Sequence, residues 1–194
     1  MKTFLVNEFG PDQGGRLFDL QQSKLREILE STKGNSDTQQ TTLKKTILPR
    51  IALYKVLSEE FGDQKKAYAV VEKYMLTVVG PKLNKQYSSL EFLPGYFTVF
   101  RKIMAGTVKK SDNWVTKIVK NDGEAVEYNI TKCLWHDACT ENGCPELCKV
   151  FCDVDHVIYA GMKKVRFVRT ETLGTGGSRC DFRFLNKGRQ KHEP

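Results

Sequence analysis

The chain has 194 residues, a length that suits one domain with a single buried core. Hydrophobic residues make up 40% and charged residues 28%, ordinary proportions that exclude wholesale disorder. The formal net charge of +8 favours anionic partners. No apolar run approaches the roughly 20 residues of a membrane span, and the first residues are too short of apolar side chains for a signal peptide. We therefore expect a cytoplasmic protein that meets no membrane.

Residues 1–108 have the hydrophobic spacing of helices. One apolar stripe predicts a helix over 17–29. A second predicts a helix over 43–61, in which Pro49 either kinks the helix or begins its main part. A third helix follows, and Gly80-Pro81 should end it. This part of the chain is expected to build a scaffold.

Residues 109–185 change to alternating apolar and polar positions, which is the pattern of strands. We expect four strands, paired as two hairpins, at 114–119, 126–133, 164–173 and 180–185. The fold class is then α+β, in one domain: a mainly helical part packed on a twisted antiparallel sheet, whose two hairpins flank a cysteine-bearing helix. Residues 186–194 should form a frayed basic tail.

The six cysteines are unevenly placed. The first 132 residues contain none, five lie between Cys133 and Cys152, and the last is Cys180. In a cytosolic protein these side chains are expected to be free thiols. Cysteines used only as small core fillers would be scattered more evenly, so the clustering is a first indication of chemistry.

The helix that Pro145 begins has two neighbouring stripes at about 100° per residue. The apolar stripe, which should face the core, is Leu147, Val150, Phe151, Val154 and Ile158. The other stripe, which should line a cavity, is Cys148, Cys152, Asp155 and Tyr159. Cys148 lies in the first turn, where the helix dipole lowers a thiol pKa, so it is a candidate nucleophile. The alternative is that these cysteines are small buried hydrophobes.

Other features are compatible with plainer roles. The spacing of Cys144, Cys148 and Cys152 differs from usual zinc and iron–sulfur motifs, so we expect no metal. The glycine run 174–177 lacks the residues of a phosphate loop and is interpreted as a hairpin turn. The basic runs lack any nucleic-acid motif, and we expect no specific nucleic-acid partner. Cys180 is either a buried thiol or part of the cavity wall.

Several short motifs together resemble one family. They are Ile130-Thr-Lys-Cys133, Glu141-x-Gly143-x-Pro145-Glu-Leu-Cys148, Phe151-Cys152-x-x-Asp155, Arg169-Thr170 and Cys180-Asp-Phe182. In these runs, and in its 51–57 helix, the chain resembles the L-2-amino-thiazoline-4-carboxylic acid hydrolase family over about residues 40 to 185. It is more distantly similar to the vinyl-reductase-like small-molecule-binding domains.

The resemblance implies hydrolysis of a small anionic heterocycle without a cofactor. A cysteine thiolate would attack the electrophilic ring carbon, a carboxylate would move the proton, and an arginine would bind the ring carboxylate. The expected catalytic residues are Cys148, with Cys180 second, and Asp155. The expected substrate-binding residues are Cys152, Glu146, Asp181, Arg169, Cys133 and Tyr159.

Two other classes of function stay open. One is a non-catalytic ligand-binding or sensor domain with a cysteine-lined cavity, and the other is a metal-thiolate protein. The oligomeric state is also open, a dimer being one option. Turnover of thiazolines and related cyclic compounds would separate an enzyme from a binding module.

Overall fold

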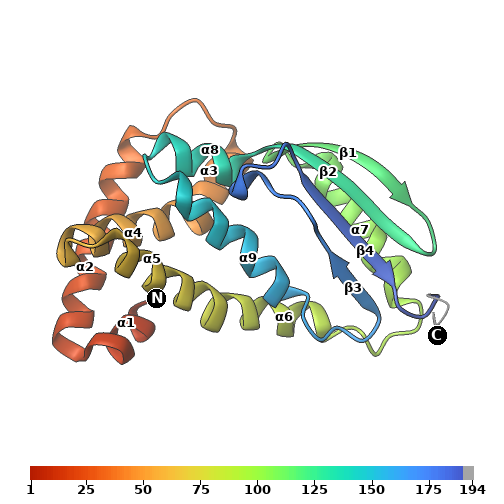
Figure 1. Cartoon of the computed structure of the whole chain (residues 1–194), viewed down its shortest axis with the longest axis horizontal. Coiled ribbons are helices and arrows are strands. Elements are labelled where there is room, and N and C mark those ends of the chain that lie inside the picture. Colours follow the sequence, from red (N-terminus) through yellow and green to blue (C-terminus); the bar gives the residue numbers. More distant parts are fainter. Residues whose placement is uncertain (190–194) are drawn as a thin grey trace.

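The computed structural model describes residues 1–189 and shows helices at one end of the molecule and a four-stranded sheet at the other (Figure 1). The α-helices are α1 (Lys2–Phe9), α2 (Pro11–Ser31), α3 (Asp37–Thr42), α4 (Leu48–Phe61), α5 (Gln64–Tyr74), α6 (Gly80–Ser88), α7 (Tyr96–Lys110), α8 (Leu134–Glu141) and α9 (Cys148–Ile158). The strands are β1 (Trp114–Asn121), β2 (Ala125–Cys133), β3 (Val165–Val168) and β4 (Cys180–Asn186). Two π-helical segments, η1 (Leu43–Ile47) and η2 (Met75–Val79), and two 3₁₀ turns, η3 (Pro145–Leu147) and η4 (Leu173–Thr175), join them. The α+β class is confirmed.

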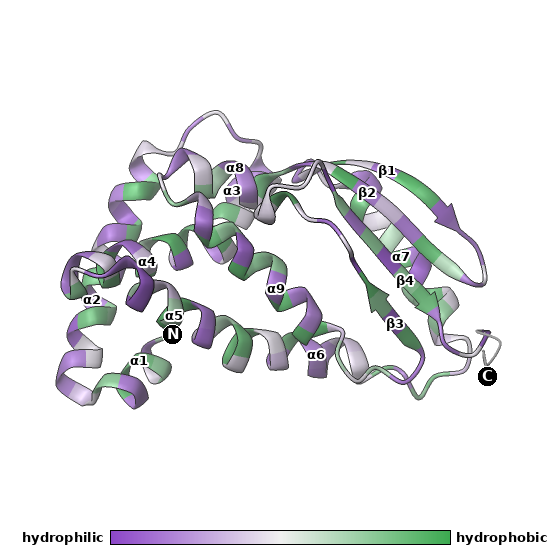
Figure 2. Ribbon diagram, in the orientation of Figure 1, coloured by the Kyte–Doolittle hydropathy of each residue, from purple (hydrophilic) through white to green (hydrophobic). Residues whose placement is uncertain are grey.

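The N-terminal helices pack around α4. Leu53 and Leu57 of this helix are fully buried, and α2 and α5 contact it on different sides. Along α2, hydrophilic and hydrophobic segments alternate, as in a helix with one face in the core (Figure 2). Gly62 ends α4 with a φ of 60°, a left-handed conformation that glycine adopts without steric cost.

The prediction that Gly80-Pro81 ends the third helix is wrong. The chain passes from α5 through η2 into α6 and stops being helical only after Ser88. Proline cannot donate the usual backbone hydrogen bond and clashes with the carbonyl four residues earlier. The π turn of η2 lies immediately before Gly80-Pro81. The segment η1 precedes Leu48-Pro49 in the same way, and Pro49 begins α4 rather than breaking it.

The four strands form one antiparallel sheet in the order β1-β2-β4-β3. The inner face of β2 and β4 carries Val126, Tyr128, Ile130 and Phe184, all buried. Helix α7 packs on β1 and β2, and in Figure 1 it lies behind the sheet while α9 runs beside it. The core therefore lies between this inner face and the two helices.

Strand β3 is shorter than the predicted 164–173. It ends at Val168, because the buried carboxylate of Asp181 accepts hydrogen bonds from the N–H groups of Thr170 and Glu171 at 2.8 and 2.7 Å. These N–H groups are thereby directed to a side chain instead of a neighbouring strand. The segment after β3 is free to fold over the start of α9.

The predicted tail from residue 186 starts inside the sheet. Asn186 is the last residue of β4, and the Lys187 N–H donates to the Lys164 carbonyl at 3.1 Å. Residues 190–194 lie outside the described part of the chain. Between residues 1 and 189, no helix combines the length and the apolar character needed to cross a membrane.

Candidate active site

A cavity of about 280 Å³ lies where α9, the inner face of the sheet and the helical part meet. Its walls are mostly apolar, with polar groups at a few places. The predicted site residues on its wall are Cys133, Cys148, Cys152, Asp155, Tyr159, Arg169 and Cys180. The structure thus brings together residues from β2, α9, β4 and the segment after β3.

Two predicted site residues do not reach the cavity. Glu146 accepts a hydrogen bond from the Tyr54 hydroxyl at 2.5 Å and ties η3 to α4. Asp181 is buried beneath the segment after β3, where it binds Thr170, Glu171 and Arg183. Both carboxylates are already occupied by protein groups, so their positions are those of structural residues.

The two stripes of α9 do not divide as cleanly as predicted. All four residues of the thiol and carboxylate stripe border the cavity, but so do Phe151, Val154 and Ile158 of the apolar stripe. Leu147 and Val150 do not, and both are fully buried. The cavity therefore lies under a broad face of α9, and the apolar stripe serves both the core and the cavity wall.

Cys148 is the first residue of α9, after the 3₁₀ turn that Pro145 begins. Hydrogen bonds from the Cys139 and Cys152 thiols lower the pKa of Cys148 to about 5, against the effect of burial. The position at the helix start acts in the same direction, because the free N–H groups there stabilise a negative charge. Cys148 is therefore the thiol of the cluster that is best suited to be a thiolate in the cavity.

The neighbouring thiols are held as proton donors. The hydrogen bond of Cys152 to Cys148 raises the pKa of Cys152 to about 11, and the hydrogen bond of Cys180 to Cys152 raises the pKa of Cys180. The Thr172 hydroxyl donates to Cys152 Sγ at 2.9 Å and lies 3.3 Å from Cys180 Sγ. The Leu173 N–H donates to Cys180 Sγ at 3.3 Å. This network favours Cys148 over Cys180 as the nucleophile.

Gly174 allows the segment after β3 to approach α9 closely. A Cβ at this residue would lie 2.8 Å from Cys152 Sγ and 3.2 Å from the backbone of Cys148. Both distances are shorter than ordinary contacts, so a side chain here would push the segment away. The glycine run, interpreted from sequence as a simple turn, therefore also closes the cavity over the thiols.

Asp155 and Arg169 form a buried ion pair in the cavity wall. Arg169 Nη1 donates to Asp155 Oδ2 at 2.7 Å, and Nη2 donates to the Cys152 carbonyl at 2.8 Å. The guanidinium also lies over the rings of Phe167 and Phe182 at 5.7 and 5.3 Å. Burial raises the pKa of Asp155 to about 6, although the Arg169 charge opposes the shift. Arg169 is thus neutralised and held in place before any ligand enters.

Three tyrosines, Tyr87, Tyr128 and Tyr159, surround this end of the cavity. The Tyr87 and Tyr159 side chains are hydrogen-bonded, and burial raises the pKa of all three. They are therefore neutral hydroxyls at any physiological pH. They supply donors and acceptors beside Asp155 without adding charge.

The sequence analysis missed several residues of the wall, namely Thr46, Arg50, Trp114, Trp135 and His136. His136 was considered and assigned to a surface or capping role. Arg50 carries a signal that was available: it is a lone charge within the apolar run 47–53. Trp114 and Trp135 stack with their rings parallel, 5.3 Å apart, a contact between β1 and α8 that no local pattern announces.

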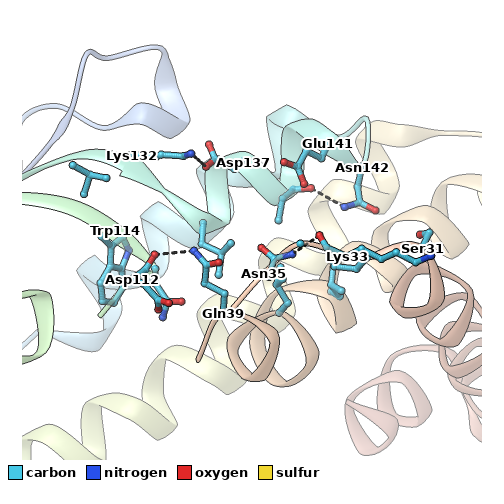
Figure 3. A pocket seen from close by; sticks show the side chains of 18 residues that line it. Ser31, Lys33, Asn35, Gln39, Asp112, Trp114, Lys132, Asp137, Glu141 and Asn142 are labelled. Atoms are coloured by element: carbon cyan, nitrogen blue, oxygen red, sulfur yellow. Dashed lines mark hydrogen bonds and ion pairs between the residues drawn. The ribbon is translucent and has the colours of Figure 1, made fainter. Parts of the chain in front are cut away.

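A second and larger hollow, of about 480 Å³, lies between the segment after α2, α8 and the start of β1 (Figure 3). Its polar groups are largely occupied by one another. Gln39 Nε2 donates to the Asp112 carbonyl at 2.8 Å, and Lys132 pairs with Asp137 at 3.8 Å. No cysteine borders it. The chemistry of this protein therefore points to the smaller, thiol-lined cavity.

Metal ligation was one of the alternatives. Among residues 1–189, no three His, Cys, Asp or Glu side chains are placed so that they could hold a metal ion. The thiols that share a stripe on α9 contact one another and Thr172 instead.

The fold and the cavity define an α+β protein with a thiol nucleophile candidate and a carboxylate in one enclosed site. A family model described as L-2-amino-thiazoline-4-carboxylic acid hydrolase matches residues 40–184. The chain belongs to this family, whose name is that of a hydrolase. No curated protein matches the chain. A solved double-substitution variant of an H-NOX protein, "Tt" in its title, aligns with 96% of this chain and 90% of its own. At 12% identity and a TM-score of 0.31, that likeness is too weak to indicate a shared fold.

Proposed function

We propose that this protein is a thiol-dependent hydrolase that opens a small carboxylated cyclic amidine, such as 2-aminothiazoline-4-carboxylate. The observation that carries the proposal is the opposite tuning of two groups in one cavity. The pKa of Cys148 is lowered to about 5 and that of Asp155 is raised to about 6. A thiolate and a protonated carboxyl therefore coexist between these values, as nucleophilic attack with acid assistance requires.

The size of the cavity supports a substrate of one ring. A protein cavity of about 150 Å³ accommodates a benzene molecule. The cavity here, about 280 Å³, has room for a five-membered ring with an amino group and a carboxylate, and for little more. Its apolar wall suits the ring carbons and sulfur, and its polar groups suit the substituents.

In the first step, the Cys148 thiolate attacks the ring carbon that bears the amino group. The bond between this carbon and the ring sulfur breaks, and the sulfur leaves as a thiol with the proton of Asp155. The opened substrate stays attached to Cys148 through the same carbon, as an isothiourea. No fragment is lost in this step, so the covalent intermediate has the mass of enzyme plus whole substrate.

In the second step, water attacks the isothiourea carbon while the Asp155 carboxylate accepts a proton. The bond to Cys148 Sγ breaks, which restores the thiolate and releases an N-carbamoyl cysteine. The hydroxyls of Tyr87 and Tyr159 are placed to orient the water beside Asp155. One water is consumed, and both catalytic groups return to their starting protonation states.

The test is turnover of 2-aminothiazoline-4-carboxylate by the full chain, followed as N-carbamoyl cysteine by mass spectrometry. A rapidly quenched reaction should show an adduct of enzyme plus substrate on the peptide that contains Cys148. Cys148→Ser should abolish turnover and adduct, with a change in unfolding free energy within about 1 kcal/mol. Cys144→Ser is the matched control, since Cys144 is a buried thiol off the cavity.

The outcomes separate the alternatives. Turnover that survives in Cys148→Ser would assign the nucleophile to another thiol, with Cys180 next in line. Tight binding without turnover, across a panel that includes hydantoins and cyclic ureas, would refute the hydrolase and indicate the ligand-binding module. The mostly apolar wall of the cavity is the observation that favours this second function.

A further inference from the structure

Arg50 is brought to the cavity by a local feature of its helix. It follows Pro49 near the start of α4 and borders the cavity from the helical side. Because Pro49 has no N–H, it cannot bond the carbonyl of Lys45, four residues earlier. Arg50 Nη1 donates to that carbonyl at 2.9 Å. The guanidinium is therefore held next to η1, at the wall of the cavity.

The charge of Arg50 has no counter-ion among residues 1–189. None of the ion pairs in this part of the chain includes it, and its buried Nε has no hydrogen-bond partner. Its closest aromatic contact is the ring of Tyr74, at 5.9 Å. Arginine stays protonated in proteins, and a buried cation without an anion is costly. Arg169, by contrast, is neutralised by Asp155.

A second observation places a polar donor beside this charge. Thr46, which lies in η1, also borders the cavity, and no hydrogen bond of its hydroxyl is formed within the described residues. The other π-helical segment, η2, contributes Met75 and Val79 to the same wall. Single π turns inside α-helices occur frequently at functional sites. Both π segments of this protein meet at the cavity.

We infer that Arg50 and Thr46 form an anion subsite that binds the carboxylate of the substrate, while Arg169 positions Asp155. The identity of the ligand rests on the proposed function; the need for an anion rests on the unpaired guanidinium. A carboxylate matches the planar fork of an arginine and can accept from both Arg50 and Thr46. This assignment replaces the sequence-based prediction that Arg169 binds the ring carboxylate.

The subsite is tested with two ligands that differ only in the carboxylate, 2-aminothiazoline-4-carboxylate and 2-aminothiazoline. Their Kd values are measured by calorimetry with full-length Cys148→Ser protein, to prevent turnover. Arg50→Gln should weaken binding of the carboxylate roughly 10- to 100-fold. It should leave the Kd of 2-aminothiazoline within about twofold. Arg50→Lys, which keeps the charge but loses the fork, should lie in between.

Arg101→Gln is the matched control. Arg101 also has a buried Nε without a partner, but it does not border the cavity. It should leave both Kd values unchanged. Thr46→Val, expected to weaken only the carboxylate ligand by several-fold, tests the subsite independently if Arg50→Gln does not fold.

An equal loss for both ligands in Arg50→Gln, or no preference of the unsubstituted subsite for the carboxylate, would overturn the assignment. The two proposals fail in different ways. Carboxylate binding that depends on Arg50 without turnover by the wild-type protein refutes the hydrolase alone. Turnover with a KM that is unaffected by Arg50→Gln refutes the subsite alone.

Discussion

The buried carboxyl of Asp155 should make the stability of this protein depend on pH. In the folded chain, burial raises its pKa to about 6 from the ordinary value of 3.8, against the opposing charge of Arg169. A carboxyl with a raised pKa binds its proton more tightly in the folded than in the unfolded state. Its contribution is therefore most favourable below pH 3.8 and is lost as the pH rises through about 6.

The magnitude follows from the difference between the two pKa values. A shift of about two units corresponds to roughly 3 kcal/mol at 1.36 kcal/mol per unit. The side chain of Asp155 is 22% exposed, so solvent screening reduces this figure only modestly. In Asp155→Asn the group does not titrate. The unfolding free energy of the wild type relative to this variant should therefore fall by about 2–3 kcal/mol between pH 4 and pH 7 and stay level above.

Urea unfolding of both proteins at a series of pH values measures this difference. Asp153→Asn is a suitable control, since Asp153 lies on the same helix outside the cavity and pairs with Lys149. The opposite slope would refute the reasoning. If the wild type gains stability relative to Asp155→Asn as the pH rises, the Arg169 charge outweighs burial and the carboxyl cannot serve as a proton donor near neutral pH.

Three further results are expected. Phe151→Ala should lower the unfolding free energy by about 3–5 kcal/mol in urea titrations, because it removes a buried ring from the core side of α9; a loss below 1 kcal/mol would place that ring outside the packed core. Gly174→Ala should lower kcat and cost about 1–3 kcal/mol of stability, because its Cβ would lie 2.8 Å from a thiol, whereas Gly106→Ala, with nothing within 4 Å, should do neither. A plot of kcat/KM against pH should rise through about 5 as Cys148 ionises and fall above about 6 as Asp155 loses its proton; a single plateau up to pH 9 would exclude Asp155 as the acid.

Local periodicity was sufficient to predict the parts of the site that lie on one element. The spacing of Cys148, Cys152, Asp155 and Tyr159 fixes their common side of a helix, whatever that helix packs against. The structure places all four on the cavity. The two hairpins were accessible for the same reason, since alternation and turn residues act within a few positions.

The parts that were missed depend on distant segments. Whether Arg169 meets a ligand or Asp155 is decided by how the segment after β3 folds over α9, and that path is set by Asp181 and Gly174. The helix predicted to stop at Gly80-Pro81 continues because a π turn accommodates the proline, and α6 then packs on α9. Propensity alone favours a break at that point.

The helices α1 and α2 lie outside residues 40–184, the part that the family model matches, and form the outer edge of the helical end in Figure 1. Nevertheless, the buried Gln21 of α2 donates from Nε2 to the carbonyl of Pro49 at 3.0 Å. That carbonyl belongs to the residue directly before Arg50. The α1–α2 pair is therefore an external brace on the helix that carries the proposed anion subsite. In this chain, substitutions in a segment remote from every reacting atom can reach the cavity through one hydrogen bond, so ligand affinity and the packing of α2 on α4 are expected to vary together.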